Sequence, residues 1–127
     1  MTSMSRSRTR TTSSAYSNFS TVLQQVATGL WRAVKEARGN CVSFTPKKVL
    51  EYAGVSENVK PIVLTLVRYI LDELVKSELL QKDEKRYRLC RYNMCEDGSM
   101  QENKLWELCK ESDSPDKIIK LLSSLVE

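Results

Sequence analysis

The amino-acid sequence predicts a mainly α-helical protein with a small antiparallel β-sheet, and two patterns carry this prediction. Three segments, beginning at Ser17, Pro61 and Pro115, repeat apolar residues every three or four positions, as helices that bury one face do. Residues 86–91 instead alternate between apolar and polar, as a half-buried strand does. With 127 residues, of which 41% are hydrophobic and 28% charged, the chain has room for one compact domain plus tails.

The predicted elements follow one another in a definite order. A helix begins at Ser17, whose hydroxyl is a suitable cap, and the short β-prone run Cys41–Phe44 comes next. Thr45-Pro46 then starts a second helix, because threonine caps helices and proline is favoured at their first position. Gly54 ends that helix, and the longest helical pattern follows from Pro61 to about Leu79.

A β-hairpin is predicted after the long helix. Residues 79–82 and 86–91 are its strands, and a polar turn lies between them. In the second strand Tyr87 and Leu89 share one face. The opposite face carries Arg86, Arg88 and Cys90. The hairpin is therefore expected to have a basic face.

The remaining segments are predicted as tails and additions. Residues 1–16 form a disordered basic tail, since they hold too few apolar residues to repay ordering, and residues 92–101 form a linker. Residues 102–127 form a helical pair that either packs back on the long helix or makes a homodimer. We favour the homodimer, because the helices have a large apolar surface that needs to be covered. The expected dimer interface is Trp106, Ile118, Leu121, Leu122 and Leu125.

Charge is unevenly distributed, and histidine is absent. Residues 1–40 contain six basic residues and one acidic residue, and residues 41–91 contain ten basic and seven acidic residues. Residues 92–127 contain four basic and eight acidic residues. Without histidine the chain lacks the commonest general base and metal ligand, and no catalytic constellation is visible, so we predict no enzyme activity and no cofactor. No apolar run is long enough for a membrane span or a secretion signal, so we expect a cytoplasmic protein with no membrane partner.

The order helix, strand, helix, turn, helix, hairpin between Ser17 and Arg91 resembles the winged helix-turn-helix proteins that are abundant among archaeal and viral DNA-binding proteins. The segment Ala53-Gly54-Val55-Ser56 is similar to their turn. The resemblance implies that the helix after the turn enters the major groove and that the hairpin, the wing, contacts the backbone or the minor groove.

Carried onto this sequence, the resemblance implies a set of DNA-binding residues, mostly basic. On the helices they are Lys47, Lys48, Asn58, Lys60, Thr65 and Arg68, with Glu57 also facing the groove. In the wing they are Lys82, Lys85, Arg86, Arg88 and Arg91. From the tail we add Arg6, Arg8 and Arg10 as an arm for phosphates or the minor groove. Lysine and arginine suit phosphates through charge.

The four cysteines do not have the paired CxxC spacing of structural zinc sites, so no metal is predicted. The winged-helix resemblance implies that the first strand pairs with the outer wing strand, which brings Cys41 near Cys90 and allows a disulfide. Buried free thiols are the state we expect.

The sequence therefore predicts a protein that binds double-stranded DNA as a transcriptional regulator or chromatin-associated protein, with no small-molecule ligand. The alternative is a winged-helix module for protein–protein interaction in a replication, transcription or membrane-remodelling assembly. The acidic Glu57 and the apolar start of the helix at Pro61 favour that alternative, whereas the basic tail and wing favour DNA.

Overall fold

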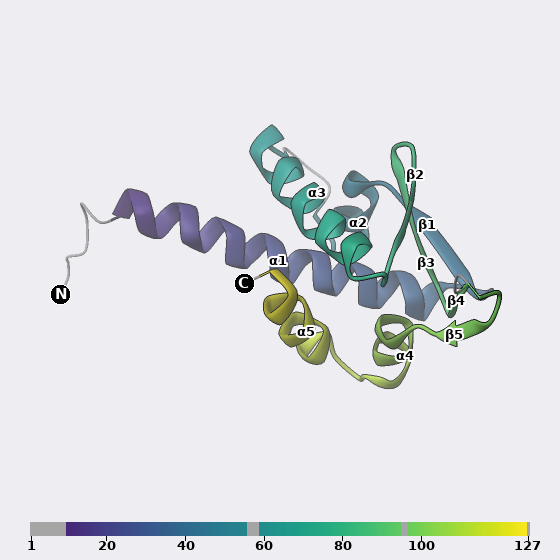
Figure 1. Cartoon of the computed structure of the whole chain (residues 1–127). Helices are drawn as coiled ribbons and strands as arrows, with labels where there is room; N and C mark the ends of the chain where they lie inside the picture. The colour runs from purple at the N-terminus through teal and green to yellow at the C-terminus, as the bar shows by residue number, and fades with distance from the viewer. Residues whose placement is uncertain (1–9, 56–58, 95–96, 127) are drawn as a thin grey trace.

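The computed structural model describes residues 10–55, 59–94 and 97–126, with side chains from residue 19 onward except that of Met94. This part of the chain is mainly helical and has two small antiparallel sheets (Figure 1). Its helices are α1 (Arg10–Glu36), α2 (Pro46–Tyr52), α3 (Pro61–Lys76), α4 (Lys104–Glu111) and α5 (Asp116–Val126). Its strands are β1 (Cys41–Phe44), β2 (Gln81–Asp83), β3 (Arg86–Cys90), β4 (Tyr92–Met94) and β5 (Met100–Glu102).

Helix α1 runs through the middle of the fold (Figure 1). Helices α2 and α3 lie on one side of it, α4 and α5 lie on the other, and all four contact it. Along its apolar stripe Val26, Leu30 and Val34 are fully buried. Helix α2 crosses α1 closely at Gly29, where any side chain would meet the backbone of Val49. The helices on both sides of α1 therefore belong to one hydrophobic core.

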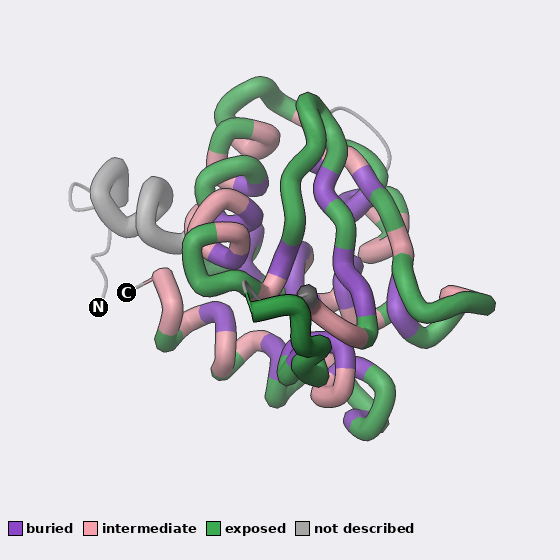
Figure 2. Tube along the Cα trace, turned by 45° about the vertical axis from the view of Figure 1, so that its right-hand side comes forward, coloured by how far each residue is buried: buried purple, intermediate pink, exposed green. Residues whose placement is uncertain are grey.

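Strands β1, β3 and β2 form an antiparallel sheet in the order β1-β3-β2. Tyr87 and Leu89 of β3 are buried against the helices. Arg86 and Arg88 alternate with them and lie on the opposite, exposed face of the sheet. Figure 2 shows this change between buried and exposed positions along the strands.

The predicted mainly helical fold with a small sheet is confirmed, as is the order of its elements up to the hairpin. Thr45 caps α2, because its side-chain oxygen accepts a hydrogen bond from the backbone N–H of Lys48 at 3.2 Å. Gly54 follows the end of α2 with a φ of 89°, a left-handed conformation that favours glycine. Pro61 is the first residue of α3.

The start of the first helix differs from the prediction. Helix α1 begins at Arg10, not at Ser17, so disorder was the wrong prediction for residues 10–16. Adding residues to a helix that is already anchored by packing fixes one residue for each hydrogen bond formed, which makes extension easier than nucleation. Residues 1–9, with Arg6 and Arg8, lie outside the described residues.

The predicted linker 92–101 is also corrected, because it contains the hairpin β4–β5, in which Tyr92 pairs with Glu102. At its turn the Asp97 carboxylate accepts hydrogen bonds from the backbone N–H and the hydroxyl of Ser99. These bonds to the charged form lower the pKa of Asp97. Strands of three residues are too short for a period-two pattern to be recognised in the sequence.

The C-terminal helices pack back on α1, which was the other arrangement considered for them. Ile118 and Leu122 are fully buried within this chain, and Trp106 is 3% exposed. The prediction that these three side chains form a dimer contact is therefore corrected, since they are buried within the single chain. Leu121 and Leu125 are half-buried and also pack against the core.

A disulfide joins Cys41 of β1 to Cys90 of β3, two residues directly opposite each other in the sheet. The expectation of free thiols is thus wrong for Cys41 and Cys90. The winged-helix resemblance had implied that these two cysteines lie close enough for a disulfide. Cys109 is a buried free thiol, and Cys95 lies outside the described residues. Among the described helices, none combines the length and apolar character that crossing a membrane requires.

Candidate nucleic-acid interface

A pocket of about 440 Å³ lies where the start of α2, the outer side of α3 and the β2–β3 hairpin meet. Its lining comprises Thr45, Pro46, Lys47, Leu64, Arg68, Lys82, Glu84, Lys85 and Tyr87. Four of these residues, Lys47, Arg68, Lys82 and Lys85, are basic, and we call them the cationic groove. They come from three elements, so the groove exists only in the folded chain.

Local structure places each groove residue. Because Thr45 caps α2 and Pro46 occupies its first position, Lys47 lies in the first turn, where its side chain is exposed. Leu64 and Arg68 are four residues apart on α3, so they lie side by side on one face of that helix. Lys85 follows Glu84, which has a φ of 56° in the tight turn between β2 and β3.

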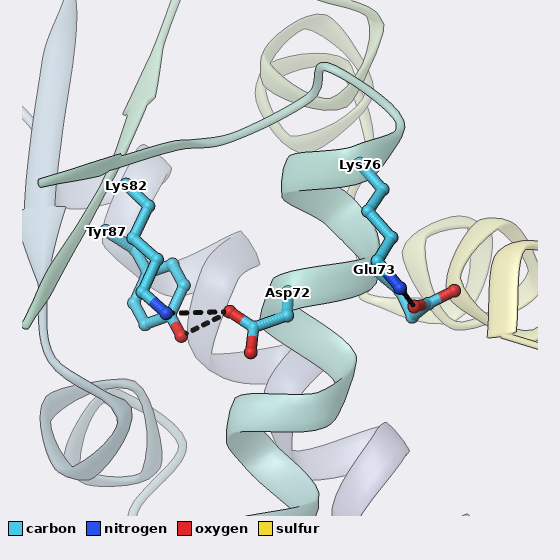
Figure 3. A network of polar contacts seen from close by, with 5 residues as sticks. All are labelled: Asp72, Glu73, Lys76, Lys82 and Tyr87. Atoms are coloured by element: carbon cyan, nitrogen blue, oxygen red, sulfur yellow. Dashed lines mark hydrogen bonds and ion pairs between the residues drawn. The ribbon is translucent and has the colours of Figure 1, made fainter.

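A polar network fixes the hairpin against α3 (Figure 3). The Tyr87 hydroxyl donates a hydrogen bond of 2.7 Å to a carboxylate oxygen of Asp72, and Lys82 Nζ lies 3.3 Å from the same oxygen. Burial, together with the hydrogen bond to Asp72, raises the pKa of Tyr87, so the phenol stays neutral. Glu73 and Lys76 form a separate ion pair of 3.0 Å further along α3.

The groove carries excess positive charge. Lys82 is paired with Asp72, but within the described part of the chain Lys47, Arg68 and Lys85 form no ion pair with a carboxylate. All four basic side chains are exposed, and Glu84 is the one acidic residue among the nine that line the pocket. An anion in the groove could therefore pair with Lys47, Arg68 or Lys85 without breaking an existing ion pair.

Other predicted residues lie elsewhere on the surface. Arg86 and Arg88 are on the sheet face that points away from α3, so they form a second basic surface, not part of the groove. Lys48 pairs with Glu51 at 3.5 Å. Lys60 is exposed just before α3, and the Thr65 hydroxyl donates a hydrogen bond to the Pro61 carbonyl. Arg10 is described only as the first residue of α1, and Asn58 and Glu57 lie outside the described residues.

Arg91 belongs to the other end of the sheet. It lies over the ring of Tyr92 and lines a second pocket of about 340 Å³ between the end of α1 and α4. That pocket mixes charges, since Glu107 and Lys110 also line it. A hydrogen bond with Glu102 raises the pKa of the Glu107 carboxyl. Arg91 therefore contributes nothing to the groove at α3.

The apolar part of the site was not predicted from the sequence. The site residues predicted on this helix were Thr65 and Arg68, whereas Leu64 also lines the pocket and Ile62 is 58% exposed. Tyr69, seven residues after Ile62 on the same helix, is 47% exposed and contacts Phe19. The i, i+4 spacing of Leu64 and Arg68 was the available signal, but it does not say which elements face them.

Among the described residues, no group of three or more histidine, cysteine or acidic side chains is placed to hold a metal ion. Comparisons of the chain with known protein families, with curated proteins and with solved structures found no match.

Proposed function

We propose that this chain is a winged-helix protein that binds double-stranded DNA, chiefly through phosphate contacts made by the cationic groove. The observation that carries the proposal is the convergence of Lys47, Arg68, Lys82 and Lys85 from three elements on one concave surface. The element order and the sheet order β1-β3-β2 support it, because they give a helix and an adjacent hairpin that can contact a duplex together.

The exposed face of α3 argues for binding with little sequence preference. Base edges are read by side chains with hydrogen-bonding groups, such as arginine, asparagine and glutamine. The outward positions of α3 include Ile62, Thr65 and Tyr69, and the hydroxyl of Thr65 is already bonded to the helix backbone. Arg68 is the exposed basic residue within α3 before its last turn. Phosphate contacts are therefore expected to dominate the affinity.

The test is fluorescence anisotropy with a labelled random duplex over a salt series. The double variant Lys47→Glu/Lys85→Glu reverses two exposed charges of the groove. Lys117→Glu/Lys120→Glu changes the net charge equally at two exposed positions of α5 and is the matched control. We expect the groove variant to lose at least about tenfold in affinity, and its slope of log affinity against log salt to fall by about two.

Equal weakening by both double variants would show a general charge effect and refute the groove as the site. Absence of binding by the parent chain at low salt would refute the proposal as a whole. Deleting residues 1–9 tests the predicted arm, because loss of Arg6 and Arg8 as phosphate contacts lowers the slope further.

A second candidate function is protein–protein interaction through α3. It is favoured by the exposed apolar side chains of Ile62 and Tyr69, which lie on one face of that helix and bring no charge to a phosphate. Ile62→Ser/Tyr69→Ser should then abolish a partner complex while leaving duplex affinity unchanged. If the outer wing face also contacts DNA, Arg86→Glu/Arg88→Glu should weaken duplex affinity.

The homodimer remains a proposal of its own. Of the interface predicted from the sequence, Leu121 and Leu125 keep part of their surface in the single chain. Sedimentation equilibrium over a range of protein concentrations measures the dimer directly, and a constant monomer mass would refute it. A role in transcription or in chromatin also stays a prediction.

A further inference from the structure

We propose that the pocket within the cationic groove binds a small organic anion that carries a hydrophobic ring, such as an aromatic sulfonate, carboxylate or phosphate. The expectation from the sequence was that the chain has no small-molecule ligand. The inference comes from how the pocket joins apolar walls to a basic rim. Binding itself does not depend on the proposed DNA function, although its consequence for DNA does.

The size of the pocket suits such a ligand. Its volume of about 440 Å³ lies within the range of roughly 300–1,000 Å³ that small-molecule sites occupy. Its sides are formed by the start of α2, by α3 and by the hairpin, and the network of Asp72 with Tyr87 and Lys82 holds two of these elements together. The pocket is therefore largely formed before any ligand enters.

The walls favour an apolar group. Leu64 is a half-buried aliphatic side chain on α3, and the buried residues Pro46 of α2 and Tyr87 of β3 also line the pocket. A phosphate of a DNA duplex would reach the exposed lysines but would leave the accessible part of Leu64 in contact with water. A ring placed against Leu64 removes apolar surface from water, which is favourable.

The rim selects the charge of the ligand. Lys47, Arg68 and Lys85 line the pocket, are exposed and form no ion pair with a carboxylate in the described part of the chain. Arg68 is beside Leu64 on the same helix face, so one ligand can contact the guanidinium and the aliphatic wall at once. Glu84 is the one acidic residue of the lining and would repel an anion, but four basic lining residues outnumber it.

If the proposed function holds, ligand and duplex compete for Lys47, Arg68 and Lys85. The ligand would then release the protein from DNA, which makes the pocket an effector site. This consequence rests on the proposed function, whereas ligand binding does not.

The probe for the test is anilinonaphthalene sulfonate, an aromatic sulfonate whose fluorescence rises in apolar surroundings, titrated into the full chain. Leu64→Trp fills the pocket, and Arg68→Gln removes a cation from its rim. The matched controls are Leu125→Trp, at another half-buried leucine, and Lys120→Gln, at an exposed lysine, both on α5 outside the pocket. Circular dichroism establishes that each variant is folded, and duplex affinity is measured in parallel.

We expect one saturable site in the parent chain, weakened about tenfold by Leu64→Trp and by a smaller factor by Arg68→Gln, with both controls unchanged. If Leu64→Trp does not fold, Arg68→Gln compared with Lys120→Gln decides. No saturable binding, or equal weakening by the controls, overturns the proposal.

The two proposals fail separately in this design. Duplex binding without probe binding overturns the pocket ligand alone. Probe binding without duplex binding overturns the DNA function and leaves the ligand site standing. When both bind, displacement of the probe by duplex supports the effector role, and simultaneous binding refutes it.

Discussion

Replacing Gly29 with alanine should destabilise the fold, although alanine is the better helix former. Gly29 lies inside α1, where exchanging glycine for alanine would ordinarily gain about 1 kcal/mol. Here the new methyl group would lie 2.8 Å from Cγ1 of Val49 and 3.0 Å from its carbonyl carbon, and closer still to its carbonyl oxygen. Since atoms of α2 backbone cannot rotate away as a side chain does, α2 must shift.

The magnitude follows from the surroundings of that contact. Val49 and Leu50 are fully buried, so moving α2 disturbs a packed core, and overpacking of this kind costs up to about 3 kcal/mol. Subtracting the propensity gain of about 1 kcal/mol leaves a net loss of about 2 kcal/mol, or roughly 8 °C in Tm.

The assay is urea unfolding followed by tryptophan fluorescence with the disulfide intact. Gly39→Ala is the matched control, because a Cβ at Gly39 meets no atom within 4 Å. We expect that control to change the free energy of unfolding by less than about 1 kcal/mol. A Gly29→Ala variant as stable as the parent chain would refute the close approach of α1 and α2.

Four further predictions concern Tyr87, the disulfide and Cys109. Tyr87→Phe removes the hydrogen bond to Asp72 and should lower the free energy of unfolding by about 1–2 kcal/mol in urea; an unchanged value would contradict the network. Because the folded chain raises the pKa of Tyr87, its contribution to stability is complete below the unfolded value near 10 and is lost as pH rises above it, which unfolding curves at increasing pH measure. Reducing the bond between Cys41 and Cys90, whose sequence separation is 49, should cost about 4 kcal/mol, and a Cys41→Ala/Cys90→Ala control should not respond to reductant. Burial raises the pKa of the Cys109 thiol to about 12, so mass spectrometry should find it unreacted with iodoacetamide at pH 8 until urea unfolds the chain.

The order and type of most elements could be predicted from the sequence because they depend on local patterns. The cap at Thr45, the proline that opens α3 and the stripe of α1 each act within one or two turns of helix. The start of α1 and the β4–β5 hairpin could not be predicted, since neither has a local pattern that distinguishes it from a loop. Local periodicity recognises an element only where one face differs from the other.

The candidate site divides in the same way. That lysines and arginines of the hairpin are exposed follows from alternation, but which of them face α3 depends on how the sheet packs. Arg86 and Arg88 therefore fall on the far face, while Lys82 and Lys85 join the groove. Likewise an apolar stripe predicts that Ile118 is buried without saying whether α1 or a second copy covers it. These are tertiary relations between residues far apart in the sequence.

The central position of α1 has a consequence for how the molecule unfolds. Both the helices that precede the hairpin and the two that follow it complete their packing on this one helix. Removal of either half would expose the side of α1 that it covers, so the chain should melt in a single cooperative transition with coincident signals from Trp31 and Trp106. A fragment ending at residue 101 would present the uncovered side of α1 to solvent and should aggregate, which makes the C-terminal helices a condition of folding for the whole chain.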